Sequence, residues 1–421
     1  MKKVLFTIQW YKIPSSIAAS ANALCDEYII DELKKDPEIE IHTLSYHISG
    51  FPLEDVIDGV HIHRFKRSKF WNDYMLIRNN HKSLKQICYH YIHRFFMRFK
   101  QILFYSKFPN YEPMQTMRFE KEALKLHKKY NFDFVISEFN GFDSVTAGAT
   151  IKKRYPSVKF LPICWDSIGG GRLAKWMPAS YCRKLRIKAE TQIMNLADAA
   201  IVMKSSENFN NSNINNISYR DKFIFLDVPY FKKCDYDINT VHNNESLTFL
   251  YSGTMGDRNP RILLETLDKL KSPIIFTFIC PISYHDAIYK LQNHLNYVTI
   301  KCLPYMQHEE LVKYQVNNDV LVNFGVLNTN AVSGKIFDYM SRGKPIISTI
   351  AIDDEACIPY MKKYPKSLVF DERKDSCTNV RELKNFISRM NTIDIDLKEI
   401  EDLFYNNTPT AYINVVKSLL S

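Results

Sequence analysis

Four residues in the C-terminal third of the chain have the types and the spacing needed to hold a phosphorylated ligand. Ser333 can cap a helix, Gly334 lets a ligand approach the backbone closely, and Lys335 adds a positive charge beside the helix N-terminus. The N–H groups and the dipole at such a terminus favour phosphate. Asp338 shares a helical face with Lys335 and can accept hydrogen bonds from ribose hydroxyls. Together they predict a site for a nucleoside diphosphate.

The surrounding residues predict the elements that hold this motif. Residues 335–342 are good helix formers, with Ile336 and Met340 on one face, and Gly343 ends the helix. Residues 346–350 (IISTI) are β-branched and follow a breaker, which predicts a buried strand. A loop, a helix and a strand in this order also form an ordinary α/β unit without a ligand, and the motif alone leaves that alternative open.

A second glycine-containing loop lies about 80 residues earlier in the chain. Residues 247–252 (LTFLYS) predict a strand, and Gly253 and Gly256 frame the loop that follows it. Backbone amides in such a loop can reach a phosphate, and the guanidinium of Arg258 can bind it with two hydrogen bonds. This loop is therefore predicted to contribute to the same diphosphate site.

The sequence DYMSRGKPII, which begins at Asp338, resembles the end of the E-x7-E motif of the family 4 retaining glycosyltransferases. In that family the second carboxylate binds the donor ribose, and Asp338 stands in its place. Asn330 stands at the position of the first Glu, which contacts the donor sugar, and its amide can still hydrogen-bond hydroxyls. The resemblance implies a GT-B fold, retention of anomeric configuration and no metal requirement.

Two further passages match the same family. Arg258 fits the downstream position of the basic pair that grips the donor diphosphate, and Thr254 stands where many members have the upstream Arg. Residues 303–306 match the short loop that sits against the nucleobase. The resemblance covers residues 247–350 by motifs and residues 1–230 by architecture alone. It implies Arg258 and Lys335 as the catalytic cations, with donor contacts from Gly253, Thr254, Tyr305, Met306, Asn330, Ser333, Gly334 and Asp338.

The N-terminal half alternates predicted strands and helices, which indicates a mostly parallel sheet with its ligands at the carboxyl ends of the strands. Ser15 and Ser16 follow the first predicted strand, residues 4–8, where the family has a glycine loop that faces the substrates. Asp166 follows another strand end. We expect these three residues on the acceptor side, although a plain structural turn explains Ser15 and Ser16 equally well.

The predicted fold is α/β of the GT-B type, with two Rossmann-like domains whose parallel sheets face a central cleft. Residues 1–235 form the acceptor-binding domain, and residues 246–400 form the donor-binding domain. A polar stretch between them is the predicted linker. Residues 401–421 are expected to form a closing helix that crosses back to the first domain, as in other proteins of this fold.

Residues 64–107 differ in composition from the rest of the chain. They contain eleven Lys or Arg, eleven aromatic residues and one acid, Asp73. Cys88, Ile92, Phe95, Phe96, Phe99 and Leu103 fall on one helical face. This predicts a basic amphipathic helix on an anionic membrane surface, with packing of the aromatics on the domain core as the alternative. No nucleic-acid motif accompanies it, so nucleic acid is not an expected partner.

The cysteine and histidine residues and the apolar runs indicate where in the cell the protein is expected. Nine scattered cysteines without a C-x-x-C pair indicate a reducing compartment and no structural zinc. His61 and His63 alternate along a predicted strand, and no third ligand stands nearby, so we expect surface histidines instead of a metal site. The apolar runs are shorter than the ~20 residues of a membrane span. The expected location is cytoplasmic, peripheral to the inner face of the cell membrane.

These patterns predict a glycosyltransferase without a cofactor, and the family resemblance implies that it is retaining and metal-independent. Its donor is a nucleoside-diphosphate sugar, UDP- or GDP-linked, and its acceptor is a lipid-linked or other saccharide in cell-surface polysaccharide assembly, such as capsule or O-antigen. The net charge of +10 fits anionic partners. Two alternatives remain at this point, a nucleotide-sugar epimerase of the same fold and a catalytically degenerate binding subunit.

Overall fold

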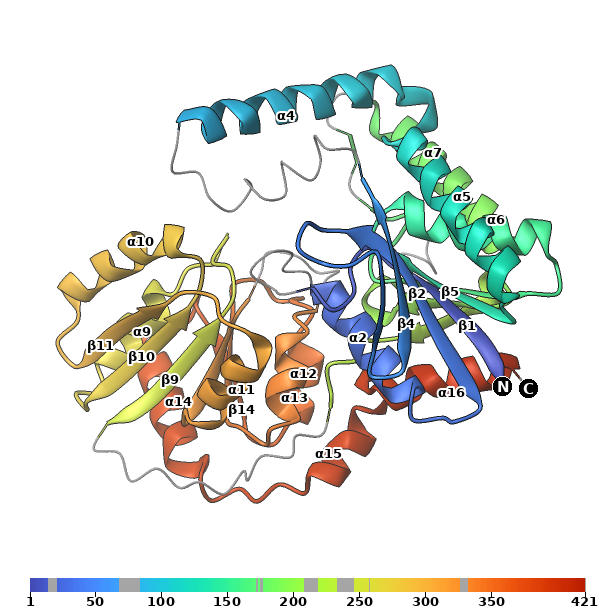
Figure 1. Ribbon diagram of the computed structural model, residues 1–421. Coiled ribbons are helices and arrows are strands. Elements are labelled where there is room, and N and C mark those ends of the chain that lie inside the picture. The colour runs from blue at the N-terminus through green and yellow to red at the C-terminus, as the bar shows by residue number, and fades with distance from the viewer. Residues whose placement is uncertain are drawn as a thin grey trace. The chain divides into compact units, whose positions relative to one another are not determined.

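The computed structural model describes residues 1–13, 21–67, 84–171, 173–174, 177–207, 219–232, 246–256, 258–325 and 332–420. The chain divides into two compact units, each with its own sheet (Figure 1). Unit 1 contains Met1–Val228 together with Pro409–Ser421, and unit 2 contains Pro229–Thr408. The chain leaves unit 1 at Val228, shortly before the predicted linker, which itself lies outside the described residues.

Unit 1 is built on an eight-stranded sheet with the order β3-β4-β2-β1-β5-β6-β7-β8. Neighbouring strands pair in parallel, except β3 and β4, which are antiparallel. The central strands β1 and β5 are mostly apolar where both of their faces are buried. The strands are β1 (Lys2–Thr7), β2 (Ile39–His47), β3 (Glu54–Ile57), β4 (Val60–Lys66), β5 (Phe134–Phe139), β6 (Lys159–Cys164), β7 (Ala200–Met203) and β8 (Phe223–Leu226).

Helices α5 and α6 of unit 1 pack on this sheet and on each other. Phe119 of α5 and Ala147 of α6 share a core cluster with Leu5 of β1. The last helix, α16, drawn in red in Figure 1, packs against α2, where Lys417 pairs with Asp36 at 2.8 Å. The helices are α2 (Ala21–Leu33), α4 (Leu84–Leu103), α5 (Pro113–Tyr130), α6 (Phe142–Arg154), α7 (Ala179–Met194) and α16 (Pro409–Leu420).

Unit 2 has a six-stranded, wholly parallel sheet with the order β11-β10-β9-β12-β13-β14. Its core includes Phe249, Phe276 and Phe324. The strands are β9 (Leu247–Ser252), β10 (Ile274–Ile279), β11 (Val298–Leu303), β12 (Val320–Phe324), β13 (Ile346–Ile350) and β14 (Ser367–Asp371). The helices are α9 (Arg261–Asp268), α10 (His285–Tyr289), α11 (His308–Val316), α12 (Lys335–Met340), α13 (Ile358–Lys363), α14 (Ser376–Arg389) and α15 (Leu397–Leu403).

Both sheets reverse their strand order at one point. In unit 1 the reversal lies between β1 and β5, and in unit 2 it lies between β9 and β12. Open α/β sheets bind ligands outside the carboxyl ends of the strands at such a reversal. The topology therefore marks one candidate position in each unit. It also confirms the predicted α/β class with two Rossmann-like, parallel-sheet domains, and the strand predicted at 346–350 is β13.

Candidate functional site

The strand reversal of unit 2 brings Lys335 to the end of β9. The ammonium of Lys335 lies 4.7 Å from the centre of the Tyr251 ring, a cation–π contact. A Cβ on Gly253 would overlap the Nζ of Lys335, and Gly253 also has a φ of +138°, which side-chain-bearing residues rarely adopt. Glycine at this position therefore serves both the backbone turn and the placement of the lysine.

Arg258 connects the loop after β9 to the end of β12 by hydrogen bonds. Its Nη1 donates to the carbonyl of Thr254 at 3.0 Å, and its Nε donates to the carbonyl of Phe324 at 3.1 Å. The hydroxyl of Tyr251 also donates to the Thr254 carbonyl, at 2.6 Å. Arg258 is therefore held in place by neutral acceptors, and its positive charge is not cancelled by them.

Arg258 lies close enough to Lys335 to affect the charge of the lysine. Burial and the positive charge of Arg258 lower the pKa of Lys335 to about 7. Among the described residues, no carboxylate forms an ion pair with either cation. An anion bound between them would restore the full charge on Lys335 and would gain the attraction of both groups. The two cations predicted from the sequence are thus brought together.

Tyr305 and Met306 follow β11, in the short connection before α11. Tyr305 is partly exposed, and burial raises the pKa of its phenol to about 12, with smaller effects that include the charge of Arg258. The phenol also acts on the pKa of Tyr251. The predicted nucleobase loop therefore lies within electrostatic reach of Arg258.

Asp338 is buried, with 7% of its surface exposed, and both of its carboxylate oxygens have protein partners. Oδ1 pairs with Nη2 of Arg342 at 2.9 Å, and Oδ2 accepts a hydrogen bond from Nε2 of Gln315 at 3.0 Å. Each oxygen has a second lone pair, which a ribose hydroxyl would have to use. The i,i+4 spacing of Asp338 and Arg342 was the signal in the sequence for this ion pair.

The helix that carries Lys335 differs from the prediction. It was expected to run to Arg342 with Ser333 as its cap, but α12 ends at Met340 and its N-cap is Gly334, without a side-chain cap. The cap prediction is therefore wrong. Such a short helix has only a weak dipole, so an anion at this place would be held mainly by the Lys335 and Arg258 charges. Gly343 has a φ of +61° after the helix, as expected of a terminating glycine. Asn330 lies outside the described residues.

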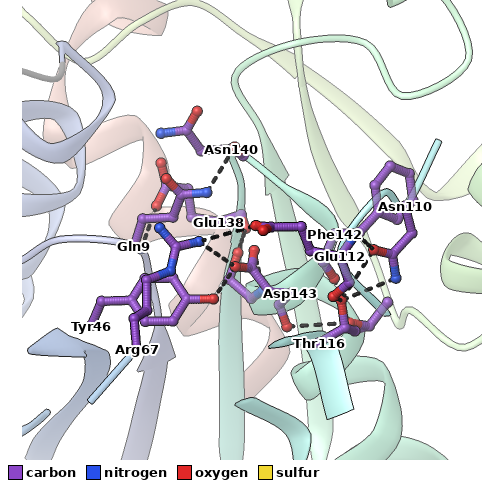
Figure 2. A network of polar contacts seen from close by, with 12 residues as sticks. Gln9, Tyr46, Arg67, Asn110, Glu112, Thr116, Glu138, Asn140, Phe142 and Asp143 are labelled. Atoms are coloured by element: carbon purple, nitrogen blue, oxygen red, sulfur yellow. Dashed lines mark hydrogen bonds and ion pairs between the residues drawn. The ribbon is translucent and has the colours of Figure 1, made fainter. Parts of the chain in front are cut away.

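The strand reversal of unit 1 holds a network of polar side chains (Figure 2). The backbone N–H of Gln9, after β1, donates to Oε2 of Glu138 at 3.0 Å, and its side-chain amide donates to the carbonyl of Asn140 at 2.9 Å. Asp26 of α2 accepts a hydrogen bond from the indole of Trp165 at 3.2 Å. These groups gather at the strand ends that the topology marks.

Glu138 and Asp26 form an acidic pair at this place. Both side chains are buried. Burial raises the pKa of Glu138 to about 7. Burial and the charge of Glu138 raise the pKa of Asp26 well above its usual range. Two carboxyl groups in this setting hold a proton near neutral pH, which suits them to acid–base chemistry.

A cation completes the network. The guanidinium carbon of Arg67 lies 3.7 Å from the centre of the Tyr46 ring, and Nη2 of Arg67 lies 3.6 Å from Oδ2 of Asp143. Tyr46 donates its hydroxyl hydrogen to the same carboxylate. Figure 2 shows these three side chains next to Glu138. Sequence reasoning missed all of them, because only the strand order reveals that the ends of β2, β4 and β5 lie at one edge.

The predicted acceptor-side residues are only partly described. Ser15 and Ser16 lie outside the described residues. Asp166 is exposed after β6. The glycine loop beside it is anchored by α7, since the Gly169 N–H donates to Oε2 of Glu190 at 2.7 Å and Arg186 donates to the carbonyl of Ile168 at 2.8 Å.

Helix α4 confirms the predicted amphipathic helix and turns its aromatic residues outward. Phe95, Phe96 and Phe99 are 69%, 49% and 52% exposed, whereas His93 is buried. The alternative in which these aromatics pack on the domain core is therefore wrong. Across the described part of the chain, no helix has the length and apolar content needed to cross a bilayer.

Comparisons with known proteins identify the fold. No family model matches the sequence, and no curated protein matches it. Among solved structures, the trehalose-6-phosphate synthase OtsA matches with a TM-score of 0.58 at 13% identity, over 100% of this chain and 99% of that chain. The UDP-GlcNAc 2-epimerase from Neisseria meningitidis bound to UDP-GlcNAc matches with a TM-score of 0.52 at 10% identity, over 99% of both chains. The UDP-GlcNAc 2-epimerase from Methanocaldococcus jannaschii matches with a TM-score of 0.50 at 12% identity, over 99% of this chain and 100% of that chain. These matches show a GT-B fold.

Proposed function

We propose that this GT-B protein is a glycosyltransferase that moves a sugar from a nucleoside-diphosphate sugar to a saccharide acceptor. The observation that carries the proposal is the pair of cations at the strand reversal of unit 2. Lys335 and Arg258 meet beside Gly253 without a carboxylate partner among the described residues. As the glycosidic bond breaks, negative charge grows on the leaving diphosphate, and two fixed cations stabilise it more than they stabilise the ground state.

In this proposal the reaction retains anomeric configuration, as the resemblance to the family 4 enzymes implies, and the two cations let it proceed without a metal. In metal-dependent transfer, a divalent ion neutralises the diphosphate, and here a guanidinium and an ammonium supply that charge. Tyr305 offers a ring against which the nucleobase can stack. In this proposal Asp338 binds the ribose and Asn330 binds the donor sugar. The rest of the donor surface is lined by Thr254, Met306, Ser333 and Gly334. The donor is UDP- or GDP-linked, and a UDP-sugar is the ligand named for one protein of the same fold.

Unit 1 would then bind the acceptor, with Ser15, Ser16 and Asp166 among its contacts. The exposed phenylalanines of α4 and the Lys and Arg around them suit a protein that meets its acceptor at an anionic membrane. A lipid-linked saccharide at the cytoplasmic face, in capsule or O-antigen assembly, is the acceptor class that this surface fits best.

One observation favours a second function. The buried pair Glu138 and Asp26 provides acid–base groups that a nucleotide-sugar epimerase needs and that a retaining transferase does not. An epimerase would convert the donor into an isomer without any acceptor.

The deciding experiment is product analysis. The protein is incubated with radiolabelled UDP- and GDP-sugars, with and without a lipid extract that contains lipid-linked saccharides. A transferase releases the nucleoside diphosphate and labels the lipid only when the extract is present. An isomeric nucleotide sugar in both reactions would establish the epimerase instead. Nucleotide binding without any product, in every donor and extract combination, would establish the binding subunit.

A further inference from the structure

A cluster of histidines and carboxylates lies on β2 and β4, at the opposite end of the strands from the polar network of Figure 2. His42 is opposite His61 in the parallel pair, so both side chains point to the same face of the sheet. Glu40 is two residues before His42 and shares that face. One ligand atom from each of Glu40, His42 and His61 lies within 4.8 Å of the others. Strand register therefore brings together three residues that the sequence separates.

His63 and Glu54 extend this cluster behind His42. His63 was expected on the surface as a plain strand histidine, but it is 3% exposed, and that expectation is wrong. Its Nε2 lies 3.0 Å from Nδ1 of His42, and its Nδ1 hydrogen-bonds the carboxylate of Glu54. On the other side, Nε2 of His42 lies 2.7 Å from Oε1 of Glu40. The chain of contacts thus runs from Glu40 through His42 and His63 to Glu54.

A bound ion accounts for the hydrogen atoms in this chain. Three hydrogen bonds need three hydrogens and two neutral imidazoles supply one each, so the third comes from a protonated imidazole unless an ion takes its place. If a metal ion replaces the hydrogen on Nε2 of His42, only two hydrogen bonds remain, and the two neutral imidazoles supply the two hydrogens that they need. Nδ1–H of His42 then donates to Nε2 of His63, and Nδ1–H of His63 donates to Glu54. A metal-bound histidine whose second nitrogen donates to an outer carboxylate chain is the usual arrangement around protein metal ions.

Aromatic rings pack against His42, whereas the outer side of the cluster is open to solvent. His42 is wholly buried, with its ring centre 4.4 Å from that of Tyr130 and 5.1 Å from that of Phe132. Glu40 and His61 are only partly buried. An ion could therefore reach Nε2 of His42 from solvent, and a water molecule could complete its coordination.

We propose that Glu40, His42 and His61 bind a divalent transition-metal ion of the zinc class, with His63 and Glu54 as the supporting outer pair. Two imidazole nitrogens and one carboxylate oxygen are ligands that zinc accepts. Zn–N bonds of about 2.0–2.1 Å require the ligand atoms to approach to roughly 3.3 Å. The rings of His42 and His61 are nearly parallel, with centres 4.6 Å apart, so His61 turns its nitrogen inward on binding.

The role of such an ion is structural. It would link β2 to β4 near their first residues, whereas the proposed substrate groups lie at the carboxyl ends of the strands. The proposal is therefore independent of the glycosyltransferase function. Removal of the ion should lower the thermal stability of the protein without abolishing nucleotide binding by unit 2.

The test uses the full chain with Cys88 and Cys377 replaced by Ser, because these exposed thiols could bind zinc themselves. The protein is freed of metal with a chelator, and zinc binding is measured by calorimetry together with the change in Tm. The expected result is one zinc ion per chain and a higher Tm. His61→Ala and Glu40→Gln should remove that binding, and their partial exposure allows the chain to fold. Far-ultraviolet circular dichroism checks that both variants fold.

Two further variants separate a built site from general histidine affinity. Glu54→Gln should weaken zinc binding about 10- to 100-fold, because it alters only the outer partner. His294→Ala removes an exposed histidine of unit 2 and should leave binding unchanged. The proposal is overturned if the protein with Cys88 and Cys377 replaced binds no stoichiometric zinc, or if zinc binds equally well to His61→Ala and Glu40→Gln.

Discussion

The Nζ of Lys335 occupies the space that a side chain on Gly253 would take. The two residues are far apart in the sequence, and the reversal of strand order between β9 and β12 places them together. The lysine can therefore lie over Tyr251 and beside Arg258 only while residue 253 has no side chain. This arrangement ties the glycine of one predicted motif to the lysine of the other.

Replacement of Gly253 by Ala should displace Lys335 and strain the backbone at a positive φ. We expect a loss of roughly 1–3 kcal/mol in the free energy of unfolding, as for other overpacked sites, and weaker nucleotide binding. Gly256→Ala is the matched control, because Gly256 also has a positive φ but no atom lies near its missing Cβ. Urea unfolding and calorimetry compare the two. Equal nucleotide affinity in both variants would contradict the proposed placement of Lys335.

The low pKa of Lys335 should give stability a specific dependence on pH. In the folded chain its pKa is about 7, and in the unfolded chain it is roughly 10.4. Between these values the unfolded chain binds more protons, so the free energy of unfolding rises with pH. The slope is at most about 1.4 kcal/mol per pH unit, because a single proton is involved, and it is smaller because solvent reaches part of this side chain. Lys335→Met should lack this contribution, so urea unfolding of the two proteins should diverge from pH 7 to 9. Parallel curves would show that Lys335 is not desolvated.

Glu138 should make the free energy of unfolding depend on pH with the opposite sign to Lys335. Its pKa is about 7 in the folded chain and roughly 4.3 when unfolded. The folded chain therefore binds more protons across this window, and the free energy of unfolding falls as the pH rises through it. Glu138→Gln should flatten that fall, whereas Glu310→Gln, at an exposed position, should not. Chemical unfolding at pH 5, 6 and 7 measures the difference, and identical profiles for both variants would refute the buried acidic pair.

The outward face of α4 should bind anionic lipid. Replacement of Phe95, Phe96 and Phe99 by Ser should release the protein from vesicles that contain phosphatidylglycerol. A triple replacement of Tyr289, Tyr297 and Tyr405, exposed aromatics of unit 2, is the matched control and should remain bound. Co-sedimentation with anionic and with neutral vesicles reports both effects. Unchanged vesicle binding by the phenylalanine variant would contradict the proposed contact between α4 and the membrane.

The sequence predicted the parts of the site that depend on local pattern. Gly253, Arg258 and Lys335 were identified from strand, loop and helix signals, and the structure brings these three residues together. The position of β13 also followed from a short β-branched run after a breaker. Such signals extend over a few residues, and local backbone chemistry decides them.

What the sequence did not reveal depends on distant strands. Glu138 and Asp26 become an acidic pair only because β1 and β5 are neighbours and α2 packs beside them. His42 becomes a partner of His61 through the register of β2 and β4. The short length of α12 has the same origin, since tertiary contacts, and not helix propensity, determine where a short helix ends.

The central claim is that Lys335 holds a nucleoside diphosphate, and nucleotide binding tests it most directly. Calorimetry with UDP, GDP and ADP is run on the wild type, on Lys335→Met and on Lys301→Met, whose lysine is exposed on β11. We predict that one diphosphate binds to the wild type and to Lys301→Met. Lys335→Met should fold with an unchanged or higher Tm, because it removes a buried charge, and should bind at least tenfold more weakly. Equal affinity of a well-folded Lys335→Met variant would contradict the account.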